Sequence, residues 1–174
     1  TLALQASEAR LRTIIETTSD LLWETDQQNV FTYVSPRVFD LLGYSPAEVI
    51  GKTPFDFMPP SEAEKTGRIF KSLAAKSASF HLLEFVNLHR DGRSVVLESS
   101  GIPILARDGG FRGYRGINRD VTERKKREEE LFASNQINQV TFDRAPIGVG
   151  HVDLDGHWLK VNDRLCEIVG YPRK

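Results

Sequence analysis

Few side chains in this sequence could do metal or nucleophile chemistry. His151 and His157 flank the turn-forming stretch VDLDG, which carries Asp153 and Asp155, so a hairpin could bring imidazole and carboxylate ligands together. Their spacing fits no closed zinc pattern, and Cys166 is the only cysteine. The sequence therefore predicts no metal site, and it predicts that Cys166 is a small packing residue before it is a reactive thiol.

No group of residues supplies the nucleophile, base and orienting group, or the paired carboxylates, that an enzyme of this size would need. The most concentrated charge is the basic run at residues 124–127, and the acidic run at residues 128–130 follows it directly. Adjacent runs of opposite sign are typical of a solvated helix face rather than a nucleic-acid surface. We expect no enzyme activity in this chain, no nucleic-acid binding and no direct membrane contact.

The composition is that of an ordinary globular domain. The 174 residues are 40% hydrophobic and 27% charged, with a formal net charge of -1. A single cysteine excludes an internal disulfide, and no signal peptide or spanning helix can be recognised. We therefore expect a cytoplasmic location, although a longer parent chain could still be anchored in a membrane.

Hydrophobic alternation and turn residues predict an α+β fold. Helices should begin at the capping residues Ser35 and Ser45 and should also span residues 61–76. The expected strands are residues 21–26, 30–35, 79–89, 93–105 and 111–121. Because short turns join most of these strands, we expect an antiparallel sheet with the helices gathered on one face.

The sequence also repeats part of itself. DQQNVFTYVSPRVFDLLGY, which starts at Asp26, aligns without a gap with DLDGHWLKVNDRLCEIVGY, which starts at Asp153, at an offset of 127 residues (153 minus 26). Identical residues and apolar positions recur together. The expected organisation is an N-terminal helix at 1–19, a complete domain at 20–121, a linker helix at 122–141 and an incomplete second copy at 142–174.

Taken in order, the stretches SPRVFDLLGYSPAEVIGK, HRDGRS and GYRGINRDVTERKK resemble a PAS domain with its PAC segment. The resemblance covers residues 8–127 and the start of the second copy. It implies a five-stranded antiparallel sheet, an internal pocket, and a sensory or regulatory role in a larger signal-transduction protein. Histidine kinases and cyclic-di-nucleotide enzymes are such proteins.

The same resemblance assigns signal coupling to Asp120, Val121, Thr122 and Glu123. In the PAS family an Asp-x-Thr element joins the last strand to an outgoing helix, so a change in the sheet alters that helix. Asp120 or Thr122 could cap the helix, and Asp120 with Glu123 has capping-box-like spacing. Apolar residues farther along the helix predict a partner surface, either the N-terminal helix or a second protomer. A homodimer through the first or the linking helix is expected, and so is a downstream effector domain in the parent chain. The alternative is a solvated linker helix with no switching role.

Three positions of the family's flavin pocket correspond to Asn87, Leu97 and Asn118, which strand alternation places on the inner face of the sheet. A polar small molecule or ordered water could bind there, or the amides could be satisfied inside a filled core. Pro54 stands where flavin-binding relatives of the LOV type carry a reactive cysteine, so the sequence excludes a flavin-thiol adduct.

Haem is not expected either. Haem-binding relatives use a histidine on the long helix, whereas residues 61–76 contain none, and His81 and His89 lie in the next predicted strand. Met58 is expected to fill the core. The cofactor therefore stays unknown. The alternative function is a flavin- or ligand-dependent enzyme or photoreceptor domain that uses the same pocket.

Overall fold

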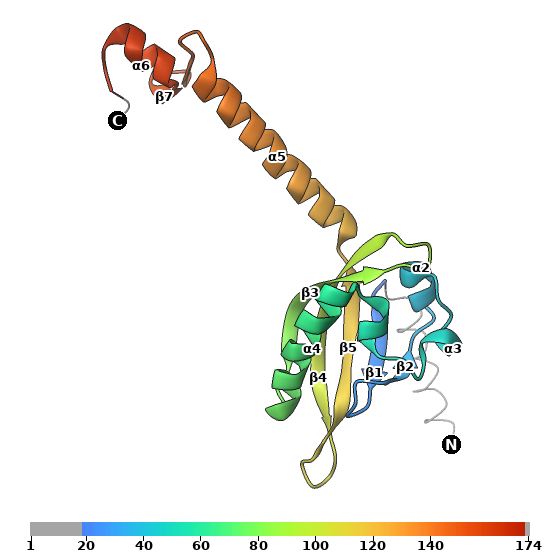
Figure 1. Ribbon diagram of the computed structural model, residues 1–174. Helices are drawn as coiled ribbons and strands as arrows, with labels where there is room; N and C mark the ends of the chain where they lie inside the picture. Colours follow the sequence, from blue (N-terminus) through green and yellow to red (C-terminus); the bar gives the residue numbers. More distant parts are fainter. Residues whose placement is uncertain (1–18, 173–174) are drawn as a thin grey trace. The chain divides into compact units, whose positions relative to one another are not determined.

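The computed structural model describes residues 19–172, and the helix expected over residues 1–19 lies, except for Ser19, outside the described residues. The chain divides into two compact units, Thr1–Glu123 and Arg124–Lys174. Each unit has a sheet of its own, with five strands in the first unit and two in the second (Figure 1).

The first unit is built on an antiparallel sheet in the order β2-β1-β5-β4-β3. Its strands are β1 Leu21–Thr25, β2 Phe31–Val34, β3 Phe80–Leu88, β4 Ser94–Leu105 and β5 Phe111–Asp120. β1 pairs with β5, so the first and last strands of the unit lie side by side in the middle of the sheet. The predicted α+β class and five-stranded antiparallel sheet are confirmed.

The helices of the first unit lie together on one face of this sheet (Figure 1). They are α2 Val38–Leu42, α3 Pro46–Val49, the 3-10 helix η1 Pro54–Phe57 and α4 Pro60–Ala75. Their buried side chains share one core with the inward-facing residues of the sheet, among them Trp23, Phe85 and Leu97. Removal of this apolar surface from water is the main force that holds the helices on the sheet.

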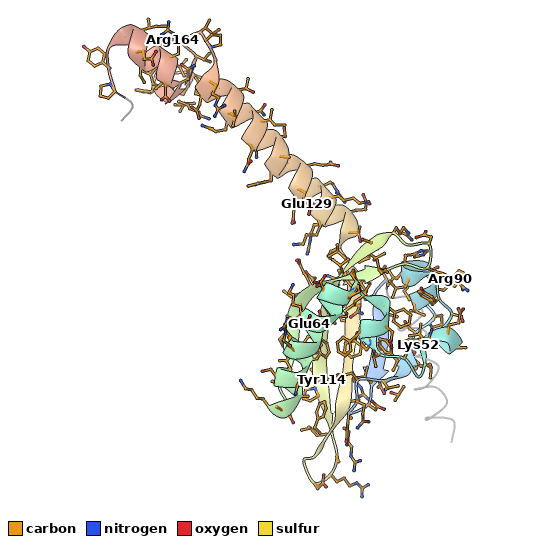
Figure 2. All side chains as sticks on the ribbon, viewed as in Figure 1. Lys52, Glu64, Arg90, Tyr114, Glu129 and Arg164 are labelled. Atoms are coloured by element: carbon orange, nitrogen blue, oxygen red, sulfur yellow. The ribbon has the colours of Figure 1, made fainter. Side chains whose placement is uncertain are left out.

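Aromatic rings fill the space between α4 and the sheet. Phe70, Phe80 and Tyr114 meet edge to face, with ring centroids 5.1 to 6.0 Å apart. Tyr114 is fully buried inside the first unit (Figure 2), and its hydroxyl donates a 3.0 Å hydrogen bond to the Ala78 carbonyl. Burial raises the pKa of the Tyr114 hydroxyl above its ordinary value, because the phenolate would lose hydration.

The start of α2 differs from the sequence-based prediction. Ser35 was expected to cap the helix, but α2 begins at Val38, and the Ser35 hydroxyl instead accepts a 3.2 Å hydrogen bond from the Leu22 amide. A buried hydroxyl at the strand junction thus satisfies the hairpin rather than the helix. The predicted helix end at Gly43 is confirmed, since Gly43 adopts the left-handed conformation with a φ of 78°.

The second unit contains most of a long helix followed by a hairpin and a short helix. These elements are α5 Thr122–Arg144, β6 Gly150–Val152, β7 Trp158–Val161 and α6 Asp163–Val169. Along α5, none of the described side chains is buried. Within residues 19–172 there is no helix with the length and apolar character needed to cross a membrane.

Candidate functional site

A small cavity lies on the inner face of the five-stranded sheet. Its volume is about 20 Å³, and its wall includes Trp23, Pro54, Phe57, Phe70, Phe85, Asn87, Leu97, Ser99 and Asn118. A space of this size suits one water molecule, whereas small-molecule pockets usually measure about 300 to 1,000 Å³. A flavin or a haem would therefore fit only if the aromatic core opened.

The three pocket positions predicted from the sequence all line this cavity. Asn87, Leu97 and Asn118 are 4%, 1% and 7% exposed, so their predicted place on the inner face is confirmed. Asn118 Oδ1 accepts a 2.7 Å hydrogen bond from Trp23 Nε1. This bond gives a buried indole N–H its partner and commits Asn118 to the core. A cofactor-binding role for the three residues stays a prediction.

Two polar atoms of the cavity wall have no hydrogen-bond partner among the described residues: Asn87 Nδ2 and Ser99 Oγ. Ser99 is fully buried and faces Asn118 across the β4–β5 pairing. A buried polar group without a partner costs roughly 1–3 kcal/mol, so this wall favours water or a small polar molecule. Sequence reasoning missed Ser99, although strand alternation from Leu97 places it on the same face.

The other residues weighed for cofactor binding lie as follows. Pro54 begins η1 and lines the cavity, so the position of the reactive cysteine in LOV-type relatives does face this space. Met58 is buried in the core, as predicted. His81 is exposed, and His89 packs beside Gly43, where an added Cβ would lie 2.8 Å from the imidazole ring.

The second candidate site is the joint between β5 and α5. The Val121 amide donates a 2.9 Å hydrogen bond to the Val96 carbonyl, and the Val96 amide donates a 2.9 Å hydrogen bond to the Thr122 hydroxyl. Val96, in β4, thus uses both of its backbone groups on this joint. Val121 is 4% exposed, which anchors the joint in the core of the first unit.

This geometry decides between the two alternative caps predicted from the sequence. Asp120 Oδ1 accepts a 2.8 Å hydrogen bond from the Thr122 amide, so Asp120 does satisfy a free N–H at the helix start. Thr122 is the first residue of α5, and its hydroxyl binds β4 instead of a helix N–H. The sequence could not reveal this partner, because Val96 and Thr122 lie 26 residues apart.

Charged groups fasten the β3–β4 turn to the start of α3. The Glu48 carboxylate accepts hydrogen bonds of 2.8 Å from the Ser45 amide and 3.0 Å from the Ser45 hydroxyl, and it lies 3.1 Å from Arg90 Nη1. The Ser45 donors, and then Arg90, hold the pKa of Glu48 below its ordinary value. The Arg90 amide adds a 2.9 Å hydrogen bond to the Leu42 carbonyl.

Hydrogen bonds of the second unit repeat those of the first at the offset found in the sequence. Asp26 Oδ1 accepts hydrogen bonds from the amides two and four residues ahead, and Asp153 Oδ1 does the same at its own turn. Gly43 and Gly170 both end a helix in the left-handed conformation, with φ of 78° and 75°. The repeat is therefore one of local structure as well as of sequence.

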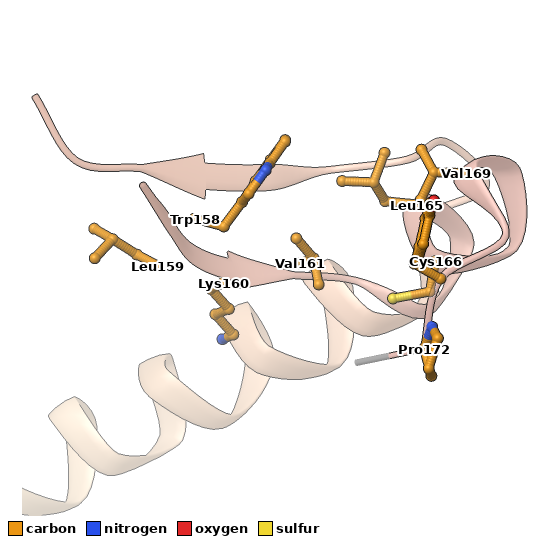
Figure 3. Close-up of a pocket in the computed structure, with 9 residues that line it drawn as sticks. Trp158, Leu159, Lys160, Val161, Leu165, Cys166, Val169 and Pro172 are labelled. Atoms are coloured by element: carbon orange, nitrogen blue, oxygen red, sulfur yellow. The ribbon is translucent and has the colours of Figure 1, made fainter. Parts of the chain in front are cut away.

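The second unit also carries an apolar groove (Figure 3). It has a volume of about 690 Å³ and is lined by Trp158, Leu159, Lys160, Val161, Leu165, Cys166, Val169, Tyr171 and Pro172. Trp158 and Tyr171 are 65% and 76% exposed, whereas their counterparts in the first unit, Phe31 and Tyr44, pack in or against its core.

The side chains weighed for metal binding gather in part. Asp153, Asp155 and His157 have ligand atoms within 4.8 Å of one another, but all three belong to the β6–β7 turn. The Asp153 carboxylate already accepts hydrogen bonds from this turn, which lower its pKa, and the turn of Asp26 has the same backbone arrangement without a histidine. Turn geometry thus explains the cluster. His151 points elsewhere, with its ring centroid 5.2 Å from that of Phe142.

A five-stranded antiparallel sheet with helices on one face, a small internal cavity and a hydrogen-bonded outgoing helix define a class of α+β domain. The chain belongs to the PAS family, since the family model described as PAS fold matches residues 15–126. The crystal structure of the PAS domain of a protein from Colwellia psychrerythraea is similar, with a TM-score of 0.59 and 25% identity over 71% of this chain and 99% of that one.

Curated relatives are much longer than this chain. It is 24% identical to the Aerobic respiration control sensor protein ArcB of Escherichia coli over 76% of its residues, and 26% identical to the Methanogenesis regulatory histidine kinase FilI of Methanothrix harundinacea over 95%. The matched regions make up 17% and 18% of those proteins, so the chain spans less than a fifth of their length.

Substitution of a polar group in the cavity wall should lower the free energy of unfolding only where that group has a hydrogen-bond partner. Asn118→Leu should lower the free energy of unfolding by about 1–3 kcal/mol, because Trp23 Nε1 loses its acceptor. Ser99→Ala should leave it within about 1 kcal/mol or raise it, because no described residue bonds its hydroxyl. Urea unfolding followed by tryptophan fluorescence measures both. A loss in Ser99→Ala equal to that in Asn118→Leu would contradict this assignment.

Proposed function

We propose that the first unit is a sensory and regulatory module of a multidomain signal-transduction protein of the histidine kinase or cyclic-di-nucleotide enzyme type. Family membership supports this, as do the names of the relatives, one a sensor protein and the other a regulatory histidine kinase. In this proposal the module performs no catalysis. It passes a ligand-induced or conformational change through α5 to an effector domain in the parent chain.

The observation that carries this proposal is the pair of hydrogen bonds between Val96 and the start of α5. Leu97, the next residue of β4, lines the cavity. A change of occupancy or packing in the cavity would therefore reach the first residue of the helix through one intervening residue, Val96. We assign the residues from β3 to this joint as a PAC segment, on the motifs HRDGRS and GYRGINRDVTERKK.

Thr122→Val tests the joint, because it removes the acceptor of the Val96 amide while keeping the shape of the side chain. We expect the first unit to stay folded and the Val96 amide to exchange with solvent roughly two- to tenfold faster, as the loss of one hydrogen bond implies. In a longer chain with an output domain, the response to stimulus should fall.

Thr122→Ser is the matched control, because it retains the hydroxyl and should behave as wild type. Hydrogen exchange measured by NMR reports on Val96, and an assay of the output domain reports on function. An unchanged response in Thr122→Val would count against the proposed coupling.

We also propose that residues 142–174 are the first hairpin and helix of a second PAS domain. The repeated hydrogen bonds and helix ends support this, and so does the groove. In the first unit the rings of Phe31 and Tyr44 both contact Phe57, at centroid distances of 6.5 and 5.1 Å. Trp158 and Tyr171 lie at the matching positions of the second unit. In this proposal, the rest of the second domain packs into the groove and covers both rings.

Trp158 provides the test of this organisation. In a longer chain that continues past residue 174, Trp158 should become buried, so its emission should shift to shorter wavelength and acrylamide should quench it less than in the 174-residue chain. Trp23→Phe in both chains isolates the signal, because the sequence has two tryptophans. Equal quenching in the two chains would show that the rest of the domain does not pack in the groove.

Finally, we propose a homodimer formed through α5. Its apolar side chains Leu131, Phe132, Ile137 and Val140 are 64%, 65%, 66% and 51% exposed, which is unusual for a solvated helix. A second copy of the same helix would cover those that lie on a shared face, since paired helices bury apolar side chains in mutual contact.

Light scattering on the eluting protein tests this dimer. The expected mass is twice 19.6 kDa, and Phe132→Glu should shift it toward 19.6 kDa by placing a charge in the apolar contact. Glu129→Gln, on the same helix, is the control and should remain dimeric. A monomeric wild type at concentrations of about 100 μM, where even weak dimers form, would overturn the proposal.

A further inference from the structure

The side chain of Asn162 makes four hydrogen bonds inside the second unit. It is fully buried, and its Oδ1 accepts hydrogen bonds of 2.9 Å from the Val149 and Leu165 amides. Its Nδ2 donates to the Phe142 carbonyl at 3.0 Å and to the Ile147 carbonyl at 2.9 Å. All four hydrogen-bonding positions of the amide are therefore used, and they join the end of α5, the following loop and the start of α6.

The hydrogen bond to the Phe142 carbonyl replaces one that α5 cannot make within itself. A carbonyl in the last turn of a helix normally accepts from the amide four residues ahead, but that residue is Pro146, which has no N–H. Asn162 Nδ2 supplies the missing donor. The fastening thus depends on a side chain that lies 20 residues farther along the chain.

Neighbouring side chains hold the same end of α5 against the hairpin. Lys160 lies on β7, two residues before Asn162. Its ammonium lies 4.6 Å from the Phe142 ring centroid and donates a hydrogen bond to Gln139 Oε1. His151, which pairs with Lys160 across the strands, contacts the same ring. The last turns of α5 are therefore docked on β6 and β7.

The corresponding position of the first unit carries a shorter polar side chain. Its counterpart of Asn162 is Ser35, whose amide donates to the Leu22 carbonyl just as the Asn162 amide donates to the Val149 carbonyl, both at 2.9 Å. The Ser35 hydroxyl accepts from Leu22, but a hydroxyl has a single proton and cannot replace both donors of Nδ2. At this position the second unit therefore has two side-chain donors, which bond the Phe142 and Ile147 carbonyls, where Ser35 offers one hydroxyl.

We propose that Asn162 is a positioning residue that fastens α5 to β7 and α6, so that a displacement of α5 moves the helix whose residues Leu165 and Val169 line the groove. This rests on the proposed function, in which α5 carries the signal. In this proposal the signal leaves the first unit at Val96 and Thr122, and the second unit receives it at Asn162.

Two variants separate the fastening from the capping of α6. Asn162→Asp keeps both acceptors and removes both donors, so amides 140–144 at the end of α5 should exchange at least about fivefold faster while the Leu165 amide stays protected. Asn162→Ser imitates the first unit and should show the same loss in α5. Arg164→Ala, which breaks only a surface ion pair with Glu167, is the control and should change neither region.

The 174-residue chain also allows a test of transmission, with hydrogen exchange read in α6. Thr122→Val should alter exchange in α6 when Asn162 is present, and this change should disappear in the Thr122→Val, Asn162→Ser double variant. Unchanged exchange at 140–144 in both Asn162 variants would overturn the fastening. A transmitted change that persists in the double variant would overturn the positioning role. If Thr122→Val alone leaves α6 unchanged, the proposed signalling through α5 fails, and faster exchange at 140–144 would still establish the local fastening.

Discussion

The backbone groups of Val96 are shared between the sheet and the start of the outgoing helix, and the connection between β4 and α5 depends on that sharing. The Val96 carbonyl accepts a hydrogen bond from the Val121 amide, and the Val96 amide donates one to the Thr122 hydroxyl. The helix start therefore cannot move without disturbing β4. Each such bond contributes about 1 kcal/mol, and about 1.4 kcal/mol shifts an equilibrium tenfold. The free energy of this joint is therefore of the size at which a modest change in the core would shift its equilibrium severalfold.

The cavity wall shows where such a change could begin. Asn118 is committed to Trp23, whereas Asn87 and Ser99 carry polar atoms that no described residue satisfies. A fully apolar wall would give a more stable core, because unpaired buried polar groups are costly. Ser99 lies on β4, the strand that bonds the helix start, three residues from Val96, and Asn87 lies on the neighbouring strand β3.

The two units show how one backbone arrangement tolerates different side chains. Three features recur at a constant offset: the Asp turn, the glycine that ends the helix, and the hydrogen bond donated by the backbone amide of the residue after the hairpin. Each satisfies backbone groups that any such hairpin and helix would leave without a partner. Ser35 and Asn162 occupy the same position with one hydroxyl and one amide. That exchange changes the number of hydrogen bonds that the side chain can donate, while the local backbone arrangement of the repeat stays the same.

The order of strands and helices, the repeat, the helix end at Gly43 and the inner-face places of Asn87, Leu97 and Asn118 could all be predicted from the sequence. Each depends on periodicity or on turn chemistry within a few residues, and local sequence carries that information. The size of the cavity, the unsatisfied Ser99 hydroxyl, the partner of Thr122 and the four bonds of Asn162 could not. They depend on which strands become neighbours and on how large side chains fill the space between them, and only the closure of the chain on itself decides distances between residues that lie far apart in sequence.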